Sequence, residues 1–89
     1  MGHFTTTQVT LSTTAQMVVP ESNRKSLQVL NTDAVITAYI GTTPRVTSSN
    51  GFPLLAGASY EFDAAAGDEV WAIAASGAPV LAYIEEFAL

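Results

Sequence analysis

The sequence predicts an all-β domain, a small antiparallel β-sandwich or barrel of roughly seven strands without a substantial helix. Short runs rich in β-branched and aromatic residues recur along the chain, and turn residues separate them at intervals of about 8–12 residues. No segment keeps an apolar stripe with the 3.6-residue period of a helix. With 89 residues, the chain is expected to form a single β domain spanning residues 1–89.

Alternation of apolar and polar residues defines the first three predicted strands. In Thr5–Leu11, Val9 and Leu11 share one face of the strand. A short apolar run, Ala15–Val19, follows and stops at a proline-containing turn. Lys25–Leu30 then places Leu27 and Val29 on one face. The Thr-rich segment 1–14 is less apolar than the rest, so we expect it to be either an N-terminal arm or an edge strand.

The second half of the chain repeats this pattern after a long loop. The later predicted strands are Ala34–Ile40, Ser59–Phe62, Glu69–Ala74 and Val80–Glu85. Residues 41–53 are predicted to form the loop, in which Asn50-Gly51 is a strong turn pair because both residues tolerate positive φ. Residues 64–66 could add one helical turn. The expected core residues are Leu27, Val29, Tyr60, Phe62 and Ile84.

Composition excludes several classes of function. Three Lys and Arg residues in a chain of net charge −5 are too few for a nucleic-acid surface, and an anionic membrane would repel the chain. No apolar run approaches the roughly 18 residues of a membrane span. The N-terminus lacks a basic region followed by an apolar core, so we expect no signal peptide and synthesis in a cytoplasm.

The residues that carry chemistry do not form a recognisable site, and we predict no enzyme activity and no cofactor. Without cysteine, and with His3 alone in a terminal segment, the chain has no ligand set for zinc. Glu61 and Asp63 alternate with Tyr60 and Phe62, so we expect both acids to face solvent. Asp68-Glu69 supplies too few oxygens for calcium.

Two further features have competing interpretations. Glu85-Glu86 ends the last predicted strand, where charge discourages wrong edge pairing. Trp71 and the three tyrosines would suit either a sugar-stacking face or anchors in a core or interface. A carbohydrate-binding module is therefore the alternative to a structural protein.

Residues 24–86 resemble small virion proteins of tailed bacteriophages. The resemblance is an ordered series of strands and turns, and no catalytic signature is part of it. Its segments are Leu27–Thr32, Ala38–Gly41, Val46–Pro53, Leu54–Glu61, Val70–Ala75 and Val80–Glu86. The resemblance implies a head decoration (cement) protein, a head-fibre base or another minor structural protein. It thus implies a location on the capsid exterior after assembly in a host cytoplasm, with the major capsid protein or another virion protein as partner.

Low charge and short length indicate that the chain assembles with itself. Only 12% of the residues are charged, about half the usual share, so ordinary solvated surface is scarce. We expect a homo-oligomer, and the family resemblance favours a trimer over a dimer. The segment before Pro20 is expected to make contacts outside its own domain, by pairing with the edge of a neighbouring chain. The candidate interface residues are Phe4, Val9, Leu11, Phe87 and Leu89.

Overall fold

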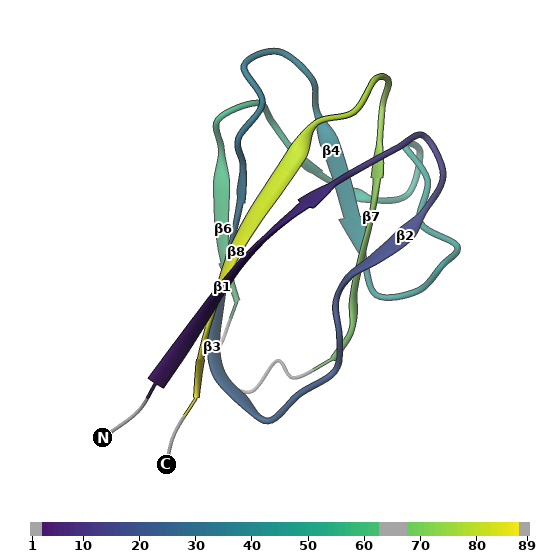
Figure 1. The fold of residues 1–89 in the computed structure, drawn as a ribbon. Coiled ribbons are helices and arrows are strands. Elements are labelled where there is room, and N and C mark those ends of the chain that lie inside the picture. The colour runs from purple at the N-terminus through teal and green to yellow at the C-terminus, as the bar shows by residue number, and fades with distance from the viewer. Residues whose placement is uncertain (1–2, 63–67, 88–89) are drawn as a thin grey trace.

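The structure, a computed structural model, describes residues 3–62 and 68–87 as two four-stranded antiparallel sheets packed face to face (Figure 1). The strands are β1 (His3–Thr10), β2 (Gln16–Val19), β3 (Arg24–Asn31), β4 (Ala38–Gly41), β5 (Phe52–Leu54), β6 (Ser59–Phe62), β7 (Val70–Ala74) and β8 (Val80–Phe87). The first sheet has the order β1-β8-β3-β6 and the second the order β2-β7-β4-β5. The all-β sandwich prediction is confirmed, and the predicted turn at residues 64–66 lies outside the described residues.

Most strand ends lie within two residues of the prediction, and two differences are larger. Phe52–Leu54 pairs with β4 as an eighth strand, although its proline and its short length are typical of a loop. Residues 34–37 precede β4 as a turn, because the carboxylate of Asp33 accepts backbone N–H bonds from Val35 and Ile36 at 2.9 and 2.7 Å. Such a side-chain bond competes with the extended strand that the apolar composition favours.

The core lies between the two sheets and is purely aliphatic at its centre. Leu27, Val29 and Leu81 face inward from the first sheet. The second sheet and the linking segments contribute Leu11, Val18, Val19, Ala38, Ile40, Leu54, Val70, Ala72 and Ala74. Burying each large aliphatic side chain contributes on the order of 1.5–3 kcal/mol. Leu27 and Val29 are thus confirmed as core residues.

Two of the predicted core residues are exposed. Ile84 is 38% exposed because the inward residues of β8 are Leu81, Tyr83 and Glu85, so the opposite face of the strand points to solvent. Tyr60 is 43% exposed although it pairs with the buried Val29, because β6 is an edge strand. Phe62, two residue pairs further along and opposite Leu27, is half-buried and packs against the core. The core prediction was therefore wrong for Ile84 and Tyr60.

Both ends of β3 carry a buried polar side chain. Asn31 donates Nδ2 hydrogen bonds to the carbonyls of Ile36 and Leu54, both at 2.9 Å, and its Oδ1 accepts from the Asp33 N–H at 3.0 Å. Arg24, at the other end, forms a salt bridge with Glu85 at 3.3 Å. These contacts connect the start of β3 to β8, and its end to the turn that follows it and to β5.

The loop between β4 and β5 folds back over the outer face of the second sheet. It buries Val46, and a Cβ on Gly51 would lie 2.7 Å from the Cβ of Tyr39. The predicted Asn50-Gly51 turn is present, with Asn50 Oδ1 accepting from the Thr47 N–H at 2.7 Å. Among the described residues only Gly57 and Gly77 have positive φ, so Gly51 is needed for close approach and not for its φ.

Candidate assembly interface

The most exposed regular element of the described structure is β1. Every side chain from His3 to Gln8 is exposed, on both faces of the strand. β1 and β8 cross the molecule diagonally and lead to both chain termini, away from the second sheet (Figure 1). As a result, one face of β1 meets the core only near Val9, which is half-buried and packs against it. β1 is therefore held mainly by its pairing with β8.

The register of β1 shows which of its backbone groups point away from β8. Leu11 donates its N–H to the carbonyl of Pro79 at 2.8 Å, and the β1–β8 pairing continues this register without a shift down to His3. Alternate residues of an antiparallel strand bond to opposite sides. The odd-numbered residues of β1 therefore bond to β8, while Phe4, Thr6, Gln8 and Thr10 direct their N–H and C=O groups outward.

One of these outward-directed backbone groups, the carbonyl of Thr10, already accepts a hydrogen bond. The side-chain Nε2 of Gln16 donates to the carbonyl of Thr10 at 3.0 Å. Within the described residues, no strand pairs with the outer edge of β1. Phe4, Thr6 and Gln8 therefore present both of their backbone groups to solvent. We call these three residues, with the backbone that joins them, the free edge.

The other three edge strands carry features that discourage pairing with another chain. β5 has three residues and contains Pro53. β2 has four residues and a register shift between Met17 and Val19. β6 has four residues and carries the exposed Glu61. Short length, proline, bulges and charge are the usual protections of sheet edges. β1 has eight residues and lacks all four.

The structure places the predicted interface residues in three different environments. Phe4 is 61% exposed, and Phe87 is half-buried with its ring stacked on His3 at 5.2 Å between centroids. Leu11 is 1% exposed and belongs to the core, so it has no surface to offer a partner, and this prediction was wrong. The reason is that the chain turns inward after Thr10 to connect the two sheets. Leu89 lies outside the described residues.

The candidate acids occupy contrasting positions. Glu61 is exposed, as its alternation with the aromatic residues predicted, and Asp63 lies outside the described residues. Glu86 accepts a hydrogen bond from Ser26 at the surface. Glu85, in contrast, is buried against Arg24 and is not a solvated strand end. Among residues 3–62 and 68–87, no three His, Asp or Glu side chains gather as a metal site would require.

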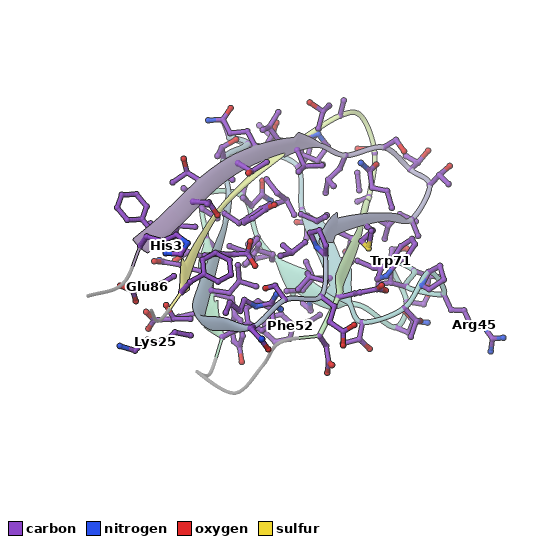
Figure 2. The ribbon with its side chains drawn as sticks, turned by 60° about the horizontal axis from the view of Figure 1, so that its bottom comes forward. His3, Lys25, Arg45, Phe52, Trp71 and Glu86 are labelled. Carbon is purple, nitrogen blue, oxygen red and sulfur yellow. The ribbon has the colours of Figure 1, made fainter. Side chains whose placement is uncertain are left out.

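Trp71 lies on the outer face of the second sheet, opposite Met17 in the register (Figure 2). Its side chain is half-buried, and its indole N–H donates to Glu69 at 2.9 Å. That bond occupies the only polar group of the indole, so a sugar hydroxyl would have to displace Glu69 to reach it.

The described part of the chain contains no helix of the length and apolarity that a membrane span requires.

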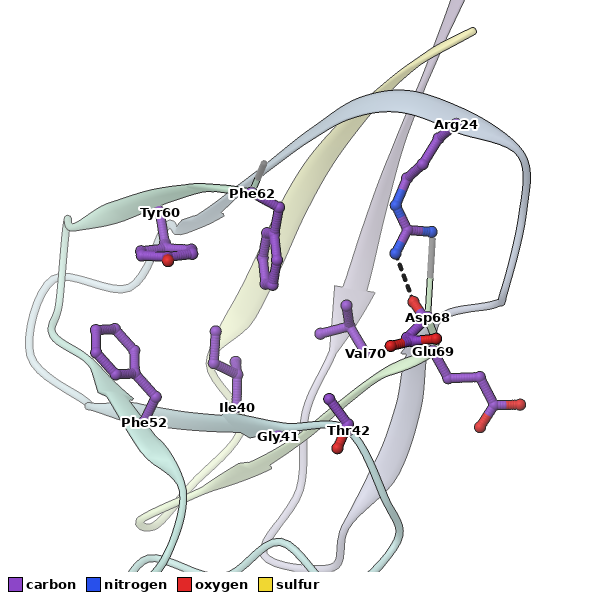
Figure 3. A pocket seen from close by; sticks show the side chains of 10 residues that line it. All are labelled: Arg24, Ile40, Gly41, Thr42, Phe52, Tyr60, Phe62, Asp68, Glu69 and Val70. Atoms are coloured by element: carbon purple, nitrogen blue, oxygen red, sulfur yellow. Dashed lines mark hydrogen bonds between the residues drawn. The ribbon is translucent and has the colours of Figure 1, made fainter. Parts of the chain in front are cut away.

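An apolar cleft opens between the sheets at the β5 and β6 edges (Figure 3). It has a volume of about 300 Å³. Phe52, Tyr60 and Phe62 form one wall, with ring centroids 5.4 and 4.9 Å apart along the series. Arg24 lies at the far side and donates to the carbonyl of Asp68.

Sequence reasoning recognised β1 as a strand but not the direction of its free backbone groups. Thr-rich composition and the absence of charge between Phe4 and Thr10 were visible signals of an unprotected strand. The side-chain bond from Gln16, which occupies part of the edge, has no sequence signature that we can identify.

Comparison with known proteins finds no matching family model and no matching curated protein. A solved structure of Bacillus endospore appendages, described as a novel family of disulfide-linked pili, contains a chain of similar fold. The TM-score is 0.60 at 13% sequence identity, and the match covers 100% of this chain and 88% of that chain. At this sequence identity, the similarity shows a shared fold and nothing further.

Proposed function

We propose that this chain is a non-enzymatic structural subunit whose copies associate with one another. The observation that carries the proposal is the free edge of β1, a row of solvent-facing backbone groups on a long strand without charge, proline or bulge. Such an edge is a template for pairing with another strand. Partner strands would satisfy its donors and acceptors and supply contacts that a domain of this size lacks in its own core.

The fold similarity to a chain of Bacillus endospore appendages supports a structural role. That assembly is described as disulfide-linked, whereas these 89 residues contain no cysteine. These residues therefore cannot form a disulfide between copies of this chain. Backbone hydrogen bonds at a strand edge and apolar side chains such as Phe4 are the groups that remain available.

The finer proposal is that the assembly is a tailed-phage virion, with this chain as a decoration protein on the exterior of the head. It rests on the resemblance of residues 24–86 to small virion proteins. The major capsid protein or another virion protein would then be the second partner, and a trimer the expected oligomer. A net charge of −5 suits the outer surface of a capsid better than its DNA-lined interior.

Sedimentation velocity over a wide range of protein concentration tests the structural role. We expect reversible association, with the average mass rising with concentration. A chain that stays monomeric at every accessible concentration, and forms no particles in electron micrographs, would contradict the proposal.

Co-sedimentation with purified capsids that lack decoration tests the finer proposal. Loss of residues 1–14 is unsuitable as a probe, because it would remove β1 and the core residue Leu11 and unfold the domain.

A further inference from the structure

We propose that two copies of this chain pair through the free edges of their β1 strands, antiparallel and about a two-fold axis at Thr6. The two β1-β8-β3-β6 sheets would then join into one continuous eight-stranded sheet. This proposal rests on the proposed function, because it names the partner strand and the register of the association. A two-fold contact of this kind is self-complementary and closes as a dimer, so this proposal departs from the trimer that the virion resemblance favours.

Backbone geometry selects the register. In a two-fold antiparallel pair, residue numbers facing each other across the contact have a constant sum. Only Phe4, Thr6 and Gln8 have both an N–H and a C=O free, since Gln16 occupies the Thr10 carbonyl. Placing Thr6 opposite Thr6 of the second copy brings Phe4 opposite Gln8 in both directions. Each copy then donates three N–H bonds and accepts three, so every group of the free edge is satisfied.

The side chains are compatible with this register. On the outer face of the sheet, the exposed ring of Phe4 would lie against the Gln8 side chain of the second copy, and the two Thr6 side chains would be direct neighbours. Thr5 and Thr7 would be neighbours on the other face. No charged residue lies between Phe4 and Thr10, so two chains of net charge −5 can approach here without placing like charges opposite each other.

The edge of β6 is a weaker partner for β1. The carbonyl of Ala58 accepts from Asn31 at 2.9 Å, so Tyr60 and Phe62 bond to β3 in the same register. In the described part of β6, only Ser59 and Glu61 therefore direct backbone groups outward. Pairing β1 with β6 would place the Glu61 carboxylate beside the contact, whereas no charged residue lies between Phe4 and Thr10 of β1. Such a head-to-tail contact would build rings, such as a trimer, or open filaments in place of a dimer.

A charge exchange at Thr6 tests whether the contact is two-fold. Thr6→Lys and Thr6→Glu each place two like charges opposite each other only if β1 meets β1 at this register. We expect each variant alone to weaken association at least about tenfold, and the mixture to form a heterodimer. Neither change touches the bonds to β8, because the Thr6 backbone faces outward. Thr13→Lys, at an exposed position outside β1, is the control and should leave association unchanged.

Disulfide trapping tests the register itself. Thr5 and Thr7 of the second copy would form a pair without mutual hydrogen bonds, with Cα atoms about 4.5 Å apart. That distance falls within the range for a disulfide, whereas Thr5 and its own copy would be more than about 7 Å apart. Because the chain has no cysteine, mixing a Thr5→Cys chain with a Thr7→Cys chain should yield the mixed disulfide under mild oxidation, and each variant alone should yield little.

The outcomes separate this proposal from the proposed function. A wild-type chain that never associates would overturn both. A chain that associates, but whose Thr6→Lys and Thr6→Glu variants behave like the wild type, would keep the structural role and exclude the two-fold β1 contact. Trimers, other rings or filaments in place of dimers, or a mixed disulfide no more abundant than the homodimers, would likewise exclude it.

Discussion

The two ends of β3 bury polar side chains in different ways. At its start, the charged Arg24 is neutralised by another side chain, Glu85, and also donates to the carbonyl of Pro20 at 3.2 Å and to that of Asp68. At its end, the neutral amide of Asn31 bonds only to backbone groups, in the turn after β3 and at the end of β5. A side-chain partner can be replaced together with Arg24, whereas a backbone partner cannot be removed. The two ends should therefore differ in whether a second substitution restores stability.

Replacing Arg24 should have the largest effect. Arg24→Met leaves the Glu85 carboxylate buried without its countercharge, and breaking a buried ion pair in this way costs about 3–5 kcal/mol. Urea unfolding followed by Trp71 fluorescence measures the change. The double variant Arg24→Met/Glu85→Leu removes both charges and should recover most of the loss. A double variant as unstable as the single one would show that the polar contacts of Arg24 to the backbone matter more than its charge pair.

Replacing Asn31 should have a smaller effect, and no second substitution should restore the lost stability. Asn31→Ala leaves the carbonyls of Ile36 and Leu54 and the N–H of Asp33 without this partner, and we expect a loss of about 2–3 kcal/mol. The same urea titration measures it. Gln28→Ala, which removes an exposed amide from the same strand, is the control and should change stability by less than about 0.5 kcal/mol. Equal effects of the two substitutions would contradict the role given to Asn31.

The smallest effect is expected at Asp33, next to the Asn31 end. Backbone N–H bonds from Ile36 and then Val35 hold the pKa of this carboxyl below its ordinary value of 3.8. The carboxylate therefore stabilises the fold fully above pH 3.8, and this contribution is lost as the pH falls through the lowered pKa of the folded state. The difference in melting temperature between the wild type and Asp33→Asn should be largest near pH 6 and should vanish at the acidic end. A difference independent of pH would contradict this role.

The sequence by itself determined the fold class and part of the core. Regular turn residues and β-branched runs are local signals, and Leu27 and Val29 alternate with polar residues so clearly that only one face of β3 could be buried. The same local pattern placed Glu61 on a solvent-facing position. The absence of charge and proline in β1 could also be read without any structure.

The tertiary structure decided the features for which local patterns were ambiguous. β8 has apolar residues on both faces, so its sequence pattern suits either orientation of the strand. The salt bridge with the distant Arg24 holds Glu85 on the buried face, and Ile84 therefore lies on the exposed face. Tyr60 has an inward position, but only the order of the strands shows that it lies at an open edge. The outward direction of Thr6 follows from the bond between Leu11 and Pro79. These features depend on which distant strands become neighbours, and a period of two residues within one strand contains no information about that choice.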